Sequence, residues 1–299
     1  MNKNIHEVLR SYNSVDYGGM DHSLLNRVIE EGTSHLHSLD YLNRCFSCID
    51  LTTLHGCDTL SGVKYFTQRV NEFNLQFDLP NVASICVFPC FVEIVRKTLL
   101  VPGVNVVSVA GAFPSSQTFL DVKILECQMA VEKGADEIDI VLPLGAFMDG
   151  NYQEVYDDIV SMKQACGNAR MKVILETGEL KLTRNICLAS LIAMEAGADF
   201  IKTSTGKVEI NATLEAAWVM TQCIKEFYLR TGRKVGFKPA GGISSVQDAM
   251  NYYFIIQNNL GDGWTNSDLF RIGASSLANN LLLAIYETGG GTSGIVDFF

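Results

Sequence analysis

Short apolar runs alternate along the chain with longer segments of helical periodicity. The runs have the length of buried strands, and turn residues follow most of them directly. They begin near Phe46, Val82, Val104, Glu137, Met171, Asp199, Lys234 and Leu269. The helical segments between them cover residues 63–77, 91–100, 117–133, 151–166, 182–195, 212–229, 245–256 and 276–287.

Eight such strand–helix units occupy roughly 240 residues, close to the size of an eight-stranded parallel β/α barrel. A doubly wound open sheet is the competing architecture, but it usually carries a glycine-rich turn after its first strand. The first predicted strand of this chain ends in Leu51-Thr52-Thr53 instead. The pattern therefore predicts an α/β fold of the TIM-barrel type.

The two ends of the chain lie outside this rhythm. Residues 1–44 are polar except for an amphipathic stretch at 24–29, and we expect an N-terminal helical extension there. The extension is expected to cover an end of the barrel or a subunit contact. Residues 45–287 form the predicted barrel domain. Residues 288–299 are rich in glycine and predict a flexible C-terminal tail.

Composition and charge narrow the class of protein. Hydrophobic residues make up 47% of the chain and charged residues 19%, which is sufficient for a large core. The net charge of −10 argues against nucleic-acid and anionic-membrane partners, since both require clustered positive charge. No run reaches the ~18 apolar residues that a membrane span needs. We also expect no signal peptide, because the first residues contain no apolar core. We expect a cytoplasmic homo-oligomer, with a dimer favoured.

Cysteines and histidines do not form a convincing metal site in the sequence. The nine cysteines lie mostly in apolar runs, which favours reduced core thiols over a disulfide framework. Cys45 and Cys48 have the spacing of a zinc pair, but no second pair completes four ligands. All five histidines lie in the first fifth of the chain. We therefore expect neither a metal nor a cofactor.

Two lysines end successive predicted strands. Lys202 follows the apolar pair Phe200-Ile201, and Lys238 ends the next strand. Barrel enzymes carry their active sites at the carboxyl ends of the strands. Alternation along the strands points both lysines into the barrel, together with Asp50 on the first strand and Asp139 on the fourth. An ion-pair network that only fills the barrel mouth is the structural alternative.

The pairing of two lysines predicts a reactive amine. Two ammonium groups ~4 Å apart repel by about 4 kcal/mol at an effective dielectric constant near 20. That repulsion corresponds to roughly three pKa units, enough to bring a lysine pKa from about 10.4 towards 7. A neutral amine forms a Schiff base with a carbonyl substrate. The carboxylate of Asp139 could then move protons, directly or through a water.

Glycine and hydroxyl residues follow three neighbouring predicted strands. These residues are Thr205, Gly206, Lys207, Gly241, Gly242, Gly273, Ser275 and Ser276. Barrels often bind phosphate in the loops after strands seven and eight, through backbone N–H groups and a helix N-terminus. Each loop alone could be turn punctuation, but their convergence predicts a phosphate site. Cys86 lies at the end of the second predicted strand, and we expect it beside the substrate without an essential chemical role. The alternative interpretation is that Cys86 is a thiol of the hydrophobic core.

On these residues the chain closely resembles the deoxyribose-phosphate aldolases, which are class I aldolases of the eight-fold β/α barrel type. The resemblance covers nearly the whole barrel, and its most specific segments are Gly197 to Lys207 and Gly236 to Gly242. The other matching segments are residues 49–54, 85–89, 134–139, 172–180 and 273–277.

The resemblance implies roles that the residues alone do not. Lys202 would form the Schiff base, Lys238 would lower its pKa and assist proton transfer, and Asp139 would be the acid/base group. Asp50 and Thr52 would line the sugar-hydroxyl end of the site. The implied reaction is reversible cleavage of 2-deoxy-D-ribose 5-phosphate to acetaldehyde and D-glyceraldehyde 3-phosphate, without a metal.

The chain departs from the family pattern in three places. Its extension before residue 45 is longer than in compact bacterial members. Residues 110–114 lack the asparagine expected before Phe-Pro, and the chain ends in Phe298-Phe299 where many members end in a tyrosine. We expect the tail to act, if at all, as an apolar lid. These departures concern turnover rate and substrate breadth more than reaction type.

Two other functions compete with this interpretation. Another Schiff-base aldolase, of the transaldolase or fructose-phosphate kind, would share one lysine but not the paired contexts of Lys202 and Lys238. A non-catalytic sugar-phosphate binding barrel would use Lys202 as an ordinary phosphate contact. Borohydride reduction in the presence of acetaldehyde separates them, because a binding protein gains no covalent mass.

Overall fold

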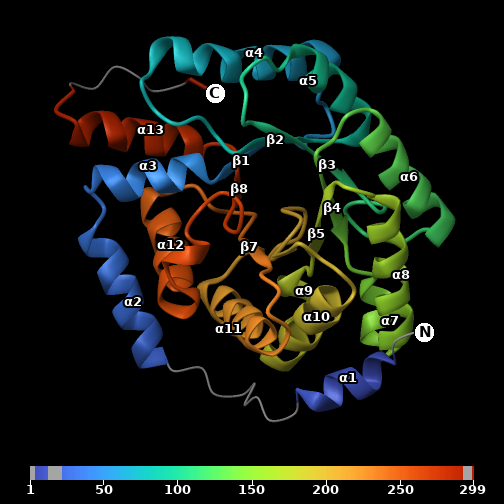
Figure 1. Cartoon of the computed structure of the whole chain (residues 1–299). Coiled ribbons are helices and arrows are strands. Elements are labelled where there is room, and N and C mark those ends of the chain that lie inside the picture. The colour runs from blue at the N-terminus through green and yellow to red at the C-terminus, as the bar shows by residue number, and fades with distance from the viewer. Residues whose placement is uncertain (1–3, 13–21, 292–297) are drawn as a thin grey trace.

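Eight parallel strands form one sheet, whose order is β7-β6-β5-β4-β3-β2-β1-β8. The computed structural model describes residues 4–12, 22–291 and 298–299. Isolated parallel bridges between Phe237 and Phe270 and between Ala240 and Gly273 join the two edges. The sheet is thereby closed into a barrel with helices around it (Figure 1). The predicted TIM barrel is confirmed.

Every predicted strand is present, in a shorter form than the apolar runs suggested. The strands are β1 (Ile49–Thr52), β2 (Ser84–Val87), β3 (Asn105–Ala110), β4 (Glu137–Val141), β5 (Arg170–Ile174), β6 (Phe200–Lys202), β7 (Gly236–Lys238) and β8 (Ile272–Ala274). The first begins at Ile49 rather than Phe46, because the preceding apolar residues complete a helix whose buried face includes Leu42, Cys45 and Phe46.

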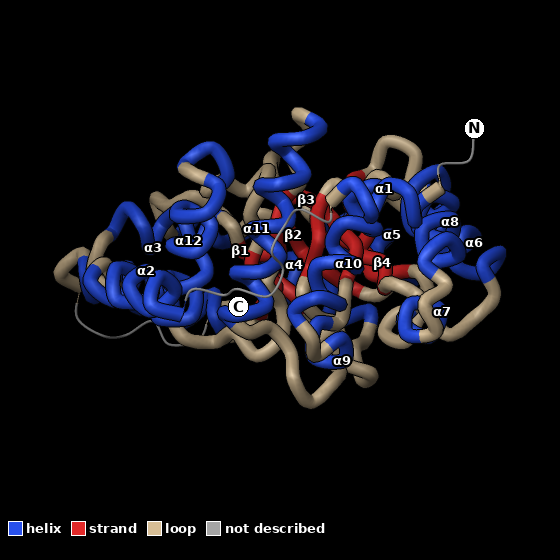
Figure 2. Tube along the Cα trace, turned by 90° about the horizontal axis from the view of Figure 1, so that it is seen from below, coloured by secondary structure: helices blue, strands red, loops and turns tan. Residues whose placement is uncertain are grey.

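The predicted helices form the outer ring. They are α4 (Leu60–Gln76), α5 (Val92–Thr98), α6 (Leu120–Glu132), α8 (Tyr152–Ala165), α10 (Thr183–Glu195), α11 (Leu214–Thr231), α12 (Val246–Leu260) and α13 (Leu277–Thr288). Short elements lie in the connections: η1 (Pro89–Phe91), α7 (Leu144–Met148), α9 (Thr177–Leu180) and η2 (Asp262–Trp264). The side view in Figure 2 shows the strands enclosed by helices, with α9 at one end of the barrel.

Local sequence explains where several of these helices begin. Thr59 and Thr213 accept hydrogen bonds from the backbone N–H groups of Gly62 and Ala216, and so cap α4 and α11. Ser245 and Asp248 form a reciprocal capping box at the start of α12. These caps satisfy N–H groups that a helix start leaves without partners.

The N-terminal extension forms the helices α1 (Ile5–Ser11), α2 (His22–Ser34) and α3 (Leu39–Ser47). α1 packs on α8 and α10, α2 on α12, and α3 on α12 and α13. In Figure 1, α1 and α2 lie outside the helical ring, whereas α3 lies between α12 and α13. The expectation that the extension covers an end of the barrel is therefore wrong for α1 and α2, and its alternative, a subunit contact, stays a prediction. The predicted domain boundary at residue 44 falls inside α3.

The last two residues pack beside α3 and α4. The Phe298 ring lies 5.7 Å from that of Phe73, and the Phe299 ring lies 6.2 Å from that of Phe46. Asn279 accepts hydrogen bonds from both terminal backbone N–H groups. Phe46 precedes β1 and Phe73 precedes β2, so this contact lies at the amino ends of the strands.

That position is opposite to the carboxyl strand ends, where a lid would act. The lid expectation is therefore wrong for these two phenylalanines, while residues 292–297 of the predicted tail lie outside the described residues. Within the described part of the chain, no helix is both long and apolar enough to cross a membrane.

Candidate active site

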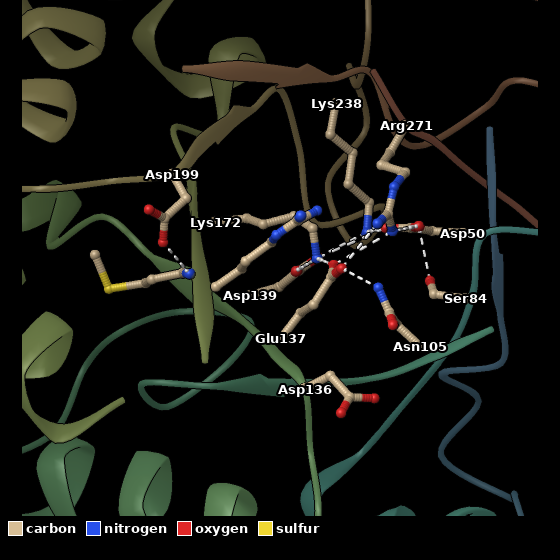
Figure 3. Close-up of polar contacts among 12 residues, drawn as sticks. Asp50, Ser84, Asn105, Asp136, Glu137, Asp139, Lys172, Asp199, Lys238 and Arg271 are labelled. Atoms are coloured by element: carbon tan, nitrogen blue, oxygen red, sulfur yellow. Dashed lines mark hydrogen bonds and ion pairs between the residues drawn. The ribbon is translucent and has the colours of Figure 1, made fainter. Parts of the chain in front are cut away.

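A cluster of buried charged side chains lies inside the barrel (Figure 3). Its members are Lys172, Lys202, Lys238, Arg271, Asp50, Glu137 and Asp139, each at most 3% exposed. They come from β1, β4, β5, β6, β7 and the residue before β8. Strand alternation explains why they meet, since apolar neighbours such as Leu51, Ile138 and Ile201 are turned to the helices and buried there.

Asp139 contacts all three lysines of this cluster. Its Oδ2 atom accepts hydrogen bonds from Lys202 Nζ at 2.9 Å and from Lys238 Nζ at 2.8 Å. Its Oδ1 atom accepts from Lys172 Nζ at 2.9 Å. The sheet register explains these contacts, because Asp139 pairs with Lys172 across β4 and β5, and Lys202 pairs with Lys238 across β6 and β7. The predicted grouping of Lys202, Lys238 and Asp139 is present in the structure.

Asp50 contacts the basic side chains of the cluster and does not line the cavity that opens at Lys202. Its carboxylate is paired with Lys238 Nζ at 2.6 Å and with Arg271 Nη1 at 2.6 Å, and it accepts a hydrogen bond from Ser84 Oγ (Figure 3). Arg271 Nη2 also donates to Glu137 Oε1 at 2.8 Å. Asp50 therefore supports the lysines electrostatically, and the structure does not place it against a substrate hydroxyl.

The pKa of Lys202 is lowered, and burial is the largest cause. The carboxylate of Asp139 opposes this shift, and the positive charge of Lys238 adds to it. The expected direction is thus present, but desolvation rather than repulsion by Lys238 dominates, because the intervening carboxylate neutralises much of that repulsion. Burial disfavours the Lys238 ammonium as well, yet Asp139 and Asp50 outweigh it and raise the pKa of Lys238.

Charge balance in the cluster singles out the same lysine. The basic groups of Lys172, Lys202, Lys238 and Arg271 face the three carboxylates of Asp50, Glu137 and Asp139. Burial disfavours ionised Asp139, but Lys172, Lys202 and Lys238 outweigh it and hold its pKa well below the ordinary value. Three ionised carboxylates balance three cations, so a neutral Lys202 leaves the buried cluster without net charge.

A cavity of about 310 Å³ opens above Lys202. Thr52 lines this cavity, and so do all of the residues predicted to bind phosphate. Those residues are Thr205, Gly206, Lys207, Gly241, Gly242, Gly273, Ser275 and Ser276. Gly241 and Gly242 have φ angles of 87° and 77°, a region that favours glycine. Ser276 precedes the first residue of α13, so its helix N-terminus faces the same space. The predicted residues therefore converge around one cavity.

Asp139, Lys238 and Cys86 do not line this cavity. Asp139 and Lys238 lie beneath Lys202, where they contact its amine rather than the open space. Cys86 is fully buried against Val107 and Val109, and burial raises the pKa of its thiol. Its placement is that of a core thiol, which was the alternative interpretation of the sequence.

Sequence reasoning missed Lys172 and Arg271 as functional candidates. Lys172 lies in the middle of the apolar run of β5, and Arg271 lies between Phe270 and Ile272. A charged residue in phase with the inward positions of a predicted barrel strand was the available signal. Within the described residues, no group of three or more His, Cys, Asp and Glu side chains is arranged to hold a metal ion.

Comparison with known proteins gives consistent matches over the barrel. A family model described as DeoC/LacD family aldolase matches residues 45–280. A putative deoxyribose-phosphate aldolase of Caenorhabditis elegans is 44% identical over 256 residues, which cover 85% of this chain and 84% of that protein. The deoxyribose-phosphate aldolase of Homo sapiens is 42% identical over 258 residues, covering 83% of this chain and 81% of its own.

Solved structures share the fold. A putative deoxyribose-phosphate aldolase from Toxoplasma gondii ME49 superposes with a TM-score of 0.74 at 22% identity, over 83% of this chain and 95% of that one. The deoxyribose phosphate aldolase of Aeropyrum pernix, described as a unique tetrameric structure, has a TM-score of 0.66 at 26% identity. That match covers 85% of this chain and 95% of the other chain.

Proposed function

The chain belongs to the DeoC/LacD family of aldolases, and on that premise we propose that it cleaves 2-deoxy-D-ribose 5-phosphate reversibly through a Schiff base on Lys202. The products are D-glyceraldehyde 3-phosphate and acetaldehyde. One observation carries the assignment of Lys202: it combines a lowered pKa with a side chain that lines the cavity. Relatives 42–44% identical over most of the chain support deoxyribose-phosphate aldolase as the activity.

The chemistry begins at the neutral amine. Lys202 Nζ attacks the C1 aldehyde of the open-chain sugar, and loss of water gives an iminium ion. Removal of the proton from the C3 hydroxyl breaks the C2–C3 bond, whose electron pair passes into the iminium and forms an enamine. D-Glyceraldehyde 3-phosphate leaves at this point. Protonation of C2 and hydrolysis of the imine then release acetaldehyde and restore Lys202.

Asp139 and Lys238 are proposed to move protons at this amine. A single oxygen, Asp139 Oδ2, accepts hydrogen bonds from both Lys202 and Lys238. The Lys238 ammonium can therefore give a proton to Asp139 across one hydrogen bond, and Asp139 can pass it to Lys202 across a second. The loops that carry Gly206, Gly241 and Ser275 line the other part of the cavity and are proposed to bind the phosphate.

Imine trapping tests the assignment of Lys202. Borohydride with acetaldehyde should leave an N-ethyl lysine, and peptide mass mapping should find it within residues 197–207. An adduct on Lys238 would reverse the two lysine roles. Absence of any adduct would favour the non-catalytic sugar-phosphate barrel.

A cleavage assay on deoxyribose 5-phosphate tests the reaction and its independence of metal. After prolonged dialysis against EDTA, we expect the rate to be unchanged, because the lysine itself serves as the electron sink. A loss of activity that zinc restores would indicate metal-dependent chemistry. Cleavage of a ketose phosphate, with none of deoxyribose 5-phosphate, would favour another Schiff-base aldolase.

The proposed setting of this reaction is a cytoplasmic homodimer. All nine cysteines are free, as expected in a reducing compartment. The proposed dimer contact is the α6 stripe, defined as Phe119, Val122, Leu125 and Met129, whose members are 50–82% exposed. Small phosphosugars and aldehydes are the proposed ligands.

A further inference from the structure

Glu176, in the turn after β5, has a conformation that residues with a Cβ seldom adopt. Its φ and ψ angles are 57° and 60°, in the left-handed region. It stands between β5 and the short helix α9, within a segment of the family resemblance to which no role was attached. Backbone strain of this kind persists where surrounding contacts determine it, and it clusters at functional sites.

Those contacts run from Glu176 to the loop after β6. Glu176 is 2% exposed, and its Oε1 atom accepts a hydrogen bond from the backbone N–H of Thr205 at 3.1 Å. Its Oε2 atom accepts from Thr205 Oγ1 at 2.5 Å. The same hydroxyl accepts from the backbone N–H of Lys207 at 3.1 Å. One carboxylate thereby orders three consecutive residues, of which the middle one is Gly206.

The turn that contains Glu176 also packs closely against other residues of the loop after β6. The backbone N–H of Thr177 donates to the carbonyl of Thr203 at 3.0 Å. An added Cβ at Gly178 would collide with the backbone carbonyl of Ile210. Backbone contacts therefore fix the distance between this turn and the loop after β6. The Glu176 carboxylate fixes the orientation of the hydroxyl and the backbone N–H of Thr205.

The carboxylate is arranged so that it does not oppose an anion in the cavity. Both oxygens of Glu176 are engaged by Thr205, and Glu176 is not among the residues that line the cavity. Thr205, Gly206 and Lys207 do line it. Glu176 thus lies behind Thr205, Gly206 and Lys207, which separate its carboxylate from the cavity.

We propose that Glu176 is a positioning residue that orients the Thr205–Lys207 loop for the phosphate of the substrate, and so sets the preference for phosphorylated sugars. It acts through Thr205 and touches no substrate atom. This inference rests on the proposed function, because it takes the cavity loops as the phosphate site.

The test compares Glu176→Ala and Glu176→Gln with the wild-type enzyme on two sugars. For deoxyribose 5-phosphate, kcat/KM should fall about 10- to 100-fold in Glu176→Ala, mainly through KM, because a charge-assisted hydrogen bond is lost. Glu176→Gln should fall less, since its amide oxygen still accepts from the Thr205 N–H. For unphosphorylated deoxyribose, both variants should stay within about twofold of the wild type, a difference too small to report a lost hydrogen bond.

Glu179→Gln is the matched control. It removes the same charge three residues along the same turn, from an exposed side chain. It should leave the ratio of the two kcat/KM values unchanged. Imine trapping with acetaldehyde alone, which involves no phosphate, should proceed at the wild-type rate in every variant.

Equal losses on both sugars, or slower trapping, would overturn the proposal and assign Glu176 to the imine lysine or to the fold. If Glu176→Ala and Glu176→Gln do not fold, Glu176→Asp carries the same comparison, because its shorter side chain draws the carboxylate away from Thr205 while keeping the charge. Failure of the proposed function looks different: the wild-type enzyme itself would then neither trap acetaldehyde nor prefer the phosphorylated sugar.

Discussion

At the scale of single residues, one carboxylate organises the chemistry of this barrel. Asp139 Oδ2 contacts both strand-end lysines, so the two ammonium groups never face each other alone. In the proposed mechanism Lys202 is the reactive amine, because it is buried with a lowered pKa and lines the cavity, whereas Lys238 contacts the carboxylates of both Asp139 and Asp50. The same reasoning predicts how substitutions at the other lysines will act.

Replacing Lys238 should move the pH dependence of imine formation. The positive charge of Lys238 lowers the pKa of Lys202, so Lys238→Met should raise it. Because the neutral amine reacts, the rate of acetaldehyde trapping rises with pH through the pKa of Lys202, and the midpoint should move to higher pH. Lys234→Met, at an exposed position four residues earlier, is the control. An unchanged midpoint would show that burial alone sets the pKa.

Replacing Lys172 should destabilise the barrel. Lys172 Nζ lies 2.5 Å from Glu137 Oε2 and 2.9 Å from Asp139 Oδ1, and all three residues are buried. Lys172→Met leaves these carboxylates undercompensated, so the free energy of unfolding should fall by about 3–5 kcal/mol. Urea titration measures the change, with Lys97→Met at an exposed ion pair as the control. Stability equal to the wild type would mean that Arg271 alone compensates Glu137.

Lys207 should contribute to phosphate binding. Its Nζ atom donates to the carbonyl of Leu54 at 2.5 Å across the cavity, and its side chain lines that cavity. Lys207→Ala should raise KM for deoxyribose 5-phosphate far more than for free deoxyribose, because only the first carries a phosphate. Steady-state kinetics on both sugars measure this difference. Equal increases would remove Lys207 from the phosphate site.

At the scale of elements, the terminal phenylalanines connect the end of the chain to α4 and α13. The Arg69 guanidinium lies 4.0 Å from the centre of the Phe298 ring, and its Nε atom donates to the Phe298 carbonyl at 2.9 Å. Asn279 on α13 binds the adjacent backbone. The last two residues therefore pack against α3, α4 and α13 near the amino ends of the strands.

Truncation of the Phe298 side chain should therefore affect stability and spare catalysis. Phe298 is 6% exposed, and Phe298→Ala should lower the free energy of unfolding by about 3 kcal/mol, as expected for a buried ring. Tyr65→Ala, at a ring that is 64% exposed and outside the α6 stripe, should change it little. Thermal unfolding and the exchange of acetaldehyde protons are the two measurements. Lost proton exchange at unchanged stability would restore a catalytic role for the tail.

At the scale of the whole molecule, barrel closure creates the site. The pairing of β8 with β1 brings Arg271 beside Asp50 from the other end of the sequence, and the bridges to Phe237 and Ala240 close the barrel on the other side of β8. Outside the barrel, the α6 stripe remains exposed and borders a cavity of about 410 Å³ against Pro89 and Glu93. An apolar surface of this kind is typical of a contact between subunits.

Disruption of the α6 stripe should separate the proposed dimer. Leu125→Asp places a charge in the middle of the stripe, where an apolar interface would have to bury it. Light scattering coupled to size exclusion should show a monomer for this variant and a dimer for the wild type. Leu229→Asp, on a different and 70% exposed position, is the control. A wild-type monomer, or an unaffected dimer in Leu125→Asp, would contradict the placement.

The sequence by itself determined the barrel, because apolar runs and helical segments alternate eight times and each follows from local periodicity. It also determined Lys202, Lys238 and Asp139, since alternation along a strand decides which side chains share a face. The glycine and serine loops of the cavity follow from turn chemistry in the same way. These features depend on neighbours a few residues apart.

Only the tertiary structure decided the electrostatics and the supporting contacts. Alternation along a strand could place Lys172 and Arg271 on the inner face, but the carboxylates that they contact depend on strand register and barrel closure. The lowered pKa of Lys202 depends mainly on burial, and burial is a property of the folded molecule. Glu176 reaches Thr205 across 29 positions of sequence, and Phe298 reaches Arg69 across 229. Such contacts arise from packing, whose partners the chain brings together only when it folds.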